Sequence, residues 1–241
     1  MTADLKIVIV GATSGIGRKM TELYCQKGYM VGITGRRKEL LDEIQHNYPS
    51  QIQTECFDIT ENQNTIHLEN LVKKLGGLDI LVISAGGGDV SKELNWQLDK
   101  LTVDTNVNGF VEIANWGFNY FVNQNHGSLA TISSIASLRG NSWAPAYSAS
   151  KAFQSNYFEG LSIKAARMKK NISVTCIEPG FVDTHMAKGD KKIWVIPVEK
   201  AARRIIAAIE KKKRKSFLSI RWWFVAKLLK LLPYWLLKRI G

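Results

Sequence analysis

A tyrosine and a lysine four residues apart are the pair best suited to proton chemistry. Residues 147–151 read Tyr-Ser-Ala-Ser-Lys, and in a helix this spacing puts Tyr147 and Lys151 on one face, one turn apart. A phenol has an ordinary pKa of about 10, and a nearby ammonium group lowers that value by favouring the phenolate. We therefore expect a proton donor or acceptor that works near neutral pH, although this spacing alone also arises by chance on helices.

A glycine-rich turn near the start of the chain predicts a second site, one for phosphate. Residues 5–10 form a short apolar run typical of a buried strand, and a turn with three glycines follows before a helical pattern. Glycines let the backbone approach a ligand closely, and a helix N-terminus offers free N–H groups to a pyrophosphate. This order favours a dinucleotide over a turn without a ligand. The expected contacts are Gly11, Thr13, Ser14, Gly15, Ile16 and Gly17.

The end of the second strand predicts which dinucleotide is bound. An acidic residue there would favour NAD, but residues 34–38 read Thr-Gly-Arg-Arg-Lys. Arginine binds phosphate through two parallel hydrogen bonds, so Arg36 and Arg37 favour NADP(H). The alternative is a basic helix start whose charges are solvated.

Apolar runs alternate with helical patterns along most of the chain, and these elements must hold the two sites together. Strands that alternate with helices imply a parallel sheet covered on both faces. We predict an α/β fold with a Rossmann-like, doubly wound parallel sheet of about seven strands, in one domain over residues 1–220. The expected strands are 5–10, 29–34, 52–57, 79–84, 128–133, 172–177 and 217–220. The expected helices are 16–27, 37–47, 61–75, 97–123, 146–169 and 198–212.

The composition excludes a disordered or fibrous chain, because 45% of the 241 residues are hydrophobic and only 5 are proline. The run at 5–10 is too short for a signal peptide. The histidines and cysteines lack the spacing of metal ligands, so we expect no metal, and we expect reduced thiols in a cytoplasmic protein. The thiols are Cys25, Cys56 and Cys176.

Positive charge is concentrated at the end of the chain. The net charge is −1 over residues 1–187 and +13 over residues 188–241. Such a segment suggests an anionic partner, either nucleic acid or a membrane surface.

The tail, residues 221–241, mixes this charge with Trp and Leu. Its longest uncharged run is seven residues, and a membrane span needs about 20. We expect an amphipathic helix that Pro233 bends or splits and that lies on an anionic membrane surface. Packing on the domain or across a dimer is the alternative, and the apolar content argues against nucleic acid. The residues expected on its polar face are Lys227, Lys230, Tyr234 and Lys238.

Several ordered motifs together make the chain resemble the short-chain dehydrogenase/reductase family over most of residues 5–220. With Arg36 and Arg37, the resemblance implies an NADP(H)-dependent oxidoreductase that interconverts a carbonyl and a secondary alcohol, assembled as a homodimer or homotetramer. The motifs are Gly11-x-x-x-Gly15-x-Gly17, Asp58-Ile59, Ala85-Gly86, Asn106-x-x-Gly109, Ser133-Ser134, Tyr147-x-x-x-Lys151 and Pro179-Gly180.

The resemblance implies a catalytic role for four residues. Tyr147 is expected to be the general acid in carbonyl reduction and the general base in alcohol oxidation. Lys151 is expected to lower the pKa of Tyr147 and hold the nicotinamide ribose, while Ser134 hydrogen-bonds the substrate oxygen. Asn106 is expected to hold a water that relays protons to Lys151. A strand-end cap at Ser134 and an ordinary helix residue at Asn106 are the alternatives.

The resemblance also implies cofactor contacts at both ends of the dinucleotide. Asp58 and Ile59 are expected at the adenine end, and Gly180, Val182 and Thr184 at the nicotinamide side. The rest of the cofactor set comprises Ala85, Gly86, Tyr147, Lys151 and Pro179.

The loop after the fourth strand departs from the family pattern. Residues 83–88 read Ile-Ser-Ala-Gly-Gly-Gly where the family has Asn-Asn-Ala-Gly, and the extra glycines predict a loose loop. His185 is placed in a lid at about 183–197. Three aromatic residues either line an apolar pocket or pack in the core. They are Trp143, Phe181 and Trp194.

A tail on a membrane favours an apolar or lipid-like substrate and a peripheral position on the inner face of a membrane. The alternative function is an NADP(H)-binding sensor or membrane-surface scaffold with this fold and no turnover. The complete set of proton-transfer residues argues against that alternative.

Overall fold

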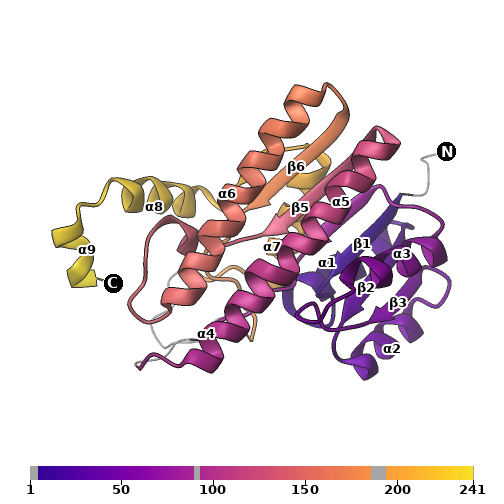
Figure 1. The fold of residues 1–241 in the computed structure, drawn as a ribbon, viewed down its shortest axis with the longest axis horizontal. Helices are drawn as coiled ribbons and strands as arrows, with labels where there is room; N and C mark the ends of the chain where they lie inside the picture. The colour runs from indigo at the N-terminus through magenta and orange to yellow at the C-terminus, as the bar shows by residue number, and fades with distance from the viewer. Residues whose placement is uncertain (1–4, 90–92, 186–193, 241) are drawn as a thin grey trace.

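Seven parallel strands form a single sheet in the computed structural model, which describes residues 5–89, 93–185 and 194–240. The strand order is β3-β2-β1-β4-β5-β6-β7 (Figure 1). The chain reverses its direction of winding at β1, which pairs with both β2 and β4. The Rossmann-like, doubly wound parallel sheet predicted from the sequence is confirmed. The strands are β1 Lys6–Val10, β2 Met30–Gly35, β3 Ile52–Cys56, β4 Ile80–Ile83, β5 His126–Ile132, β6 Asn171–Ile177 and β7 Lys215–Ser216.

Helices cover both faces of this sheet, and the core lies in two layers. In β1, Ile7 and Ile9 are buried on one face, and Val8 and Val10 are buried on the other, as the two-residue period of a strand requires. Helices α1, α2 and α7 pack on the first face, and α3, α5 and α6 pack on the second. The helices are α1 Gly15–Gln26, α2 Lys38–Asn47, α3 Asn64–Leu75, α4 Trp96–Val103, α5 Phe110–Gln124, α6 Pro145–Met168, α7 Val198–Glu210, α8 Ile220–Leu231 and α9 Tyr234–Ile240.

One long predicted helix contains an irregular turn. The pattern at 97–123 is helical, but α4 and α5 are joined by a π-helical turn, Asp104–Gly109. Such turns are rare and concentrate at functional sites, and this one carries Asn106. A 3₁₀ turn, Ile135–Leu138, follows β5 in the same region.

The end of the domain differs from the prediction. The strand expected at 217–220 is wrong, because β7 is only Lys215–Ser216. Its neighbour β6 leads into Glu178, whose N–H donates to the Ser216 carbonyl at 2.9 Å. Ser219 instead caps α8, since its side chain accepts from the Trp222 N–H. Helix initiation at Ser219 therefore takes the last predicted strand residues out of the sheet.

The tail forms two short helices. The predicted break at Pro233 is confirmed, because α8 ends at Leu231 and α9 begins at Tyr234. The predicted polar face is wrong, because Lys227 and Lys230 belong to a different helix from Tyr234 and Lys238. Within the described ranges, no helix is long and apolar enough to cross a bilayer.

Candidate active site

The predicted catalytic residues meet at the carboxyl edge of the parallel sheet. Ser134 follows β5, Tyr147 and Lys151 lie in the first turns of α6, and Asn106 lies in the π-helical turn. Their proximity is seen at Gly86, just after β4. A Cβ atom there would lie 3.0 Å from Lys151 Nζ and 3.2 Å from Asn106 Oδ1.

The side chain of Ser134 lies beside the phenol of Tyr147. Desolvation raises the pKa of Tyr147 above its ordinary value of 10, and the Ser134 hydroxyl offsets only part of that rise. The lowered pKa expected from the sequence is therefore not produced by the protein alone. Ser134 Oγ also accepts from the Ala136 N–H at 3.1 Å, so this side chain caps the 3₁₀ turn as well as meeting Tyr147.

Lys151 is almost completely buried beside Tyr147. Its Nζ lies 5.8 Å from the centre of the Tyr147 ring. It donates to the Ile132 carbonyl at 3.0 Å and to Gln154 Oε1 at 2.9 Å. Desolvation lowers the pKa of Lys151 to about 8. The ammonium group is therefore charged at neutral pH and loses its proton in mildly alkaline solution.

The side chain of Asn106 is fully buried and holds the loop after β4. Its Oδ1 accepts from the Gly87 N–H at 2.9 Å, and its Nδ2 donates to the Gly87 carbonyl at 2.6 Å. The same Nδ2 lies 2.9 Å from Ser150 Oγ. The water relay implied at Asn106 stays a prediction, and the described contacts give this residue a structural role next to Lys151.

Gln154 is a site residue that the sequence analysis missed. Its Oε1 accepts from Lys151, and its Nε2 donates to the main-chain carbonyl of Asn106 at 3.0 Å. The side chain is buried, and buried polar groups are almost always paired. Its spacing of three from Lys151 on a helix is the signal that points to it.

The glycine loop after β4 is held in place, so the predicted loose loop is wrong for residues up to 89, where this described range ends. Gly87 is bound by Asn106 on both its N–H and its carbonyl. Gly88 packs so closely on Tyr147 that a Cβ atom would lie 2.3 Å from the ring. The missing side chain is what allows this contact.

The glycine-rich turn has the shape that a pyrophosphate requires. Gly11 has φ +84°, a left-handed conformation, and a Cβ there would lie 2.5 Å from the Ala85 nitrogen. A Cβ at Gly17 would lie 2.2 Å from the Gly11 carbonyl oxygen. Thr184 faces Gly15, where a Cβ would lie 3.4 Å from the threonine methyl. Bare backbone at the N-terminus of α1 therefore fits a dinucleotide phosphate.

Two arginines at the end of β2 lie beside this turn. Arg37 Nη2 donates to Thr13 Oγ1 at 2.7 Å and to Ser14 Oγ at 3.0 Å. Arg36 pairs with Asp58 at 3.1 Å and is largely exposed. Burial would raise the pKa of Asp58, but hydrogen bonds from Thr60 and Arg36 outweigh it and hold this pKa below its ordinary value.

Ile59 is the other residue expected at the adenine end, and the position of its carbonyl explains why residue 109 is a glycine. A Cβ at Gly109 would lie 2.0 Å from the Ile59 oxygen. The last residue of the π-helical turn therefore has to be a glycine for the two segments to approach.

The loop after β6 is joined both to the catalytic side and to the tail. The Pro179 carbonyl accepts from the Ile135 N–H at 2.9 Å, and Val182 forms a bridge with Ile196. The indole of Trp222 covers Gly180, where a Cβ would lie 2.1 Å from the ring. The expected nicotinamide side is thus in contact with α8, as the alternative of tail packing on the domain predicted for this part of the tail.

The three aromatic residues considered for a pocket separate into two groups. Trp143 lines a hollow with Tyr147, next to Leu98 and Pro145. Phe181 and Trp194 instead pack edge-on against Trp222. Their ring centres lie 5.7 Å and 5.9 Å, respectively, from the ring centre of Trp222.

The expected lid is described only at its two ends. His185 is exposed at the first of these ends. Residues 186–193 lie outside the described ranges.

The profile of the family described as short chain dehydrogenase matches residues 6–193. The chain belongs to the short-chain dehydrogenase/reductase family. The chain is 34% identical to an uncharacterized oxidoreductase of Myxococcus xanthus over 185 residues, which cover 74% of this chain and 72% of that one.

Solved structures of short-chain dehydrogenases share its fold. A short-chain dehydrogenase from Streptomyces avermitilis has a TM-score of 0.82 at 24% identity, covering 94% of this chain and 92% of that one. ElxO with NADP bound has a TM-score of 0.80 at 20% identity, covering 92% of this chain and 99% of that one. The protein is therefore an oxidoreductase of this family, with a Rossmann-like fold shared with an NADP-binding neighbour.

Proposed function

We propose that this dehydrogenase interconverts a carbonyl and a secondary alcohol with NADP(H), and that Tyr147 is its general acid and base. The observation that carries the proposal is the Tyr147 phenol, which lies beside the Ser134 hydroxyl and the buried ammonium of Lys151. A proton donor, a hydroxyl to orient the substrate and a fixed positive charge are what carbonyl reduction needs from a protein.

Each side chain has a separate task in this reaction. In reduction, Tyr147 gives its proton to the carbonyl oxygen, while Ser134 donates a hydrogen bond to the same oxygen. The nicotinamide, when bound, supplies the hydride chemistry. Lys151 stabilises the phenolate that remains. In alcohol oxidation Tyr147 takes the hydroxyl proton, so the same groups act in reverse.

The dinucleotide is held at both ends by residues that fit it. The bare backbone of Gly11, Gly15 and Gly17 receives the pyrophosphate, and Arg36 and Arg37 bind the 2′-phosphate of NADP(H). The likeness to ElxO with NADP bound supports this choice. Asp58 shares Arg36 with that phosphate, so the ion pair with Asp58 weakens on binding.

The proposed substrate is apolar or lipid-like, as the apolar, basic tail suggests. Leu94 and Trp143 are exposed apolar side chains at the hollow beside Tyr147, which Asp89, Glu93 and Asp99 also line. A homodimer or homotetramer is supported by exposed Leu101 on α4 and Phe153 on α6, two helices that lie against each other. We place the protein in the cytoplasm, peripheral on the inner face of a membrane, with the tail 221–241 as its contact.

NADPH oxidation tests this function. The protein is mixed with NADPH or NADH and a panel of short-chain and long-chain ketones, and nicotinamide absorbance is followed. We expect turnover with NADPH, faster with apolar ketones. Tight NADPH binding without turnover on any ketone, aldehyde or β-keto lipid would instead favour the sensor or scaffold.

A further inference from the structure

The tail helix α8 has two opposite apolar faces, and the inner one is fixed to the domain. Trp222 and Ala226 are buried, and Val225 and Leu229 are partly buried. These four residues fall on one side of a helix with 3.6 residues per turn. The inner face therefore explains why α8 keeps a defined position.

Two contacts far apart along α8 hold that position. Near its start, Trp222 packs against Gly180 and Phe181. Just beyond its end, Arg139 Nη2 donates to the Leu232 carbonyl at 2.9 Å. Arg139 directly follows the 3₁₀ turn that Ser134 caps. The helix thus bridges the two loops that border the catalytic residues.

The outer face of α8 is apolar and exposed. It consists of Ile220, Phe224, Leu228 and Leu231, each between 61% and 81% exposed. Their spacing of three and four residues puts them within an arc of about 80° on the side opposite Trp222. Beyond the break at Pro233, α9 also carries exposed aromatic residues. They are Tyr234 and Trp235.

The charge around this outer face has a single sign. Residues 220–241, which hold α8 and α9, contain five Lys and Arg and no Asp or Glu. Arg221 and Lys227 lie at the two borders of the outer face, both exposed. The pattern is an apolar strip with cations at its edges, which suits lipid tails next to anionic headgroups.

We propose that the outer face of α8, with α9, docks this protein on an anionic lipid bilayer. A second copy of the same face would bring Arg221 and Lys227 against the same two cations, with no acidic residue in α8 or α9 to offset them, which like-charge repulsion opposes. Nucleic acid would leave four large apolar side chains without a partner. An anionic bilayer satisfies both the apolar strip and the cations.

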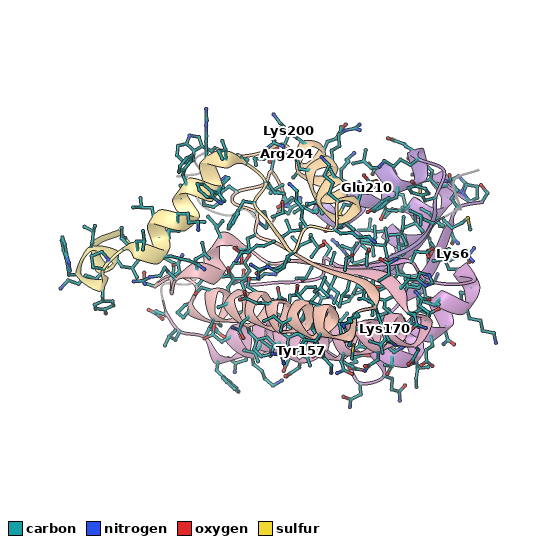
Figure 2. The ribbon with its side chains drawn as sticks, turned by 90° about the horizontal axis from the view of Figure 1, so that it is seen from above. Lys6, Tyr157, Lys170, Lys200, Arg204 and Glu210 are labelled. Carbon is teal, nitrogen blue, oxygen red and sulfur yellow. The ribbon has the colours of Figure 1, made fainter. Side chains whose placement is uncertain are left out.

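Docking in this way places the bilayer next to a helix that contacts the two loops beside the catalytic residues. Figure 1 shows α8 and α9 beside the loops that lead into α6, and Figure 2 shows the same two helices projecting from one end of the molecule. Because α8 is held at Gly180 and at Arg139, the bilayer and the hollow beside Tyr147 keep a fixed relation. The docking step does not depend on the reaction, whereas a gain in turnover on a membrane-dissolved ketone rests on the proposed function.

Co-sedimentation with vesicles tests the docking step. The full-length protein is mixed with vesicles of phosphatidylcholine alone or of phosphatidylcholine with phosphatidylglycerol. We expect binding to the anionic vesicles only. The double variant Phe224→Ser with Leu228→Ser, and the double variant Lys227→Gln with Lys230→Gln, should each lower the partition coefficient about tenfold or more.

Matched variants on other helices distinguish an effect of this face from a general loss of surface hydrophobicity or positive charge. Ile66→Ser with Ile163→Ser removes two exposed apolar side chains from α3 and α6. Lys73→Gln with Lys200→Gln removes two exposed cations from α3 and α7, where Figure 2 labels Lys200. Both controls should bind vesicles like the unmodified protein, and thermal unfolding confirms that every variant folds.

Three results would overturn the docking proposal. They are no binding to anionic vesicles, equal losses in the test and control variants, and a drop in oligomeric state, by light scattering without lipid, in the Phe224 and Leu228 variant. Turnover is a separate measurement. The ratio of rates on a vesicle-dissolved long-chain ketone and on a water-soluble ketone should fall in that variant. Binding without any turnover would contradict the proposed function and leave docking standing.

Discussion

Lys151 donates a 2.9 Å hydrogen bond to Gln154, one turn further along α6. The same amide donates to the Asn106 carbonyl at 3.0 Å, so one side chain links the catalytic helix to the π-helical turn. A buried ammonium that loses its acceptor is left with an unmet hydrogen bond, which costs about 1–3 kcal/mol.

Gln154→Leu should therefore lower the free energy of unfolding by about 1–3 kcal/mol, measured by urea denaturation. It should also move the alkaline limb of the kcat profile, because Lys151 loses an acceptor. Gln154→Glu is the matched variant, since it keeps an acceptor and adds a negative charge that favours the ammonium. Its alkaline limb should move to higher pH, and identical profiles in both variants would contradict the role of Gln154.

Tyr147→Phe should lower kcat by about 10²- to 10⁴-fold, because it removes the proton that the reaction transfers. The ring contact with Gly88 is kept, so NADPH affinity should stay within about twofold by fluorescence titration. Ser134→Ala should lower kcat less, since the phenol remains. Turnover retained in Tyr147→Phe would exclude Tyr147 as general acid.

Gly88→Ala should lower kcat, because its Cβ would lie 2.3 Å from the Tyr147 ring and displace it. A shift of this size in a catalytic group costs on the order of 10²-fold in rate. Gly87→Ala is the neighbouring control, since no atom lies within 4 Å of the Cβ it adds. Steady-state kinetics give kcat for both variants. Equal kcat values would mean that the position of the Tyr147 ring is unimportant.

Arg37→Gln should weaken NADPH binding about tenfold and leave NADH binding nearly unchanged, because only NADPH carries the 2′-phosphate. Arg36→Gln should act in the same direction and also free Asp58 from its ion pair. Isothermal titration with both dinucleotides measures the difference. Equal losses for NADPH and NADH would show that the arginines shape the turn rather than read the phosphate.

The stability of the protein should depend on Lys151 in alkaline solution. Its pKa falls from 10.5 in the unfolded chain to about 8 in the folded protein because of desolvation. Between these values the unfolded state binds more protons, so this group makes stability rise with pH from about 8 to about 10.5. Buried thiols act oppositely, since desolvation raises the pKa of Cys25 and Cys176 to about 12.

The difference between the unmodified protein and Lys151→Met isolates that contribution. Urea denaturation of both at several pH values should show stability rising less, or falling more, with pH in the variant. Parallel pH dependences would mean that Lys151 keeps its proton when folded.

The fold could be predicted because its central strands β1 and β4 are apolar runs. These runs are buried on both faces of a parallel sheet and leave a plain signal. The meeting of Asn106, Ser134, Tyr147 and Lys151 at one edge was also predictable from ordered motifs. The motifs could not predict that the pKa of Tyr147 is raised, because desolvation depends on the packing of the whole site.

Contacts between segments distant in the sequence explain the other misses. Trp222 looks like a membrane-facing residue when read with its neighbours, but it is buried over Gly180. The π-helical turn could not be predicted, because the apolar pattern at 97–123 fits an ordinary helix. The early end of β7 follows from Ser219, which caps α8, a local signal that the apolar residues at 217–220 obscured.

Because Trp222 packs on Gly180, the inner and outer faces of α8 are under different evolutionary constraints. Inner-face positions such as Ala226 are expected to change slowly, and only together with the loop after β6 that they cover. Outer-face positions such as Leu228 contact only the surface on which the protein docks, so one apolar residue can replace another there. Sequences of relatives should therefore show slow substitution on the inner face of α8 and faster substitution on its outer face, so that the two rates alternate with the helical period.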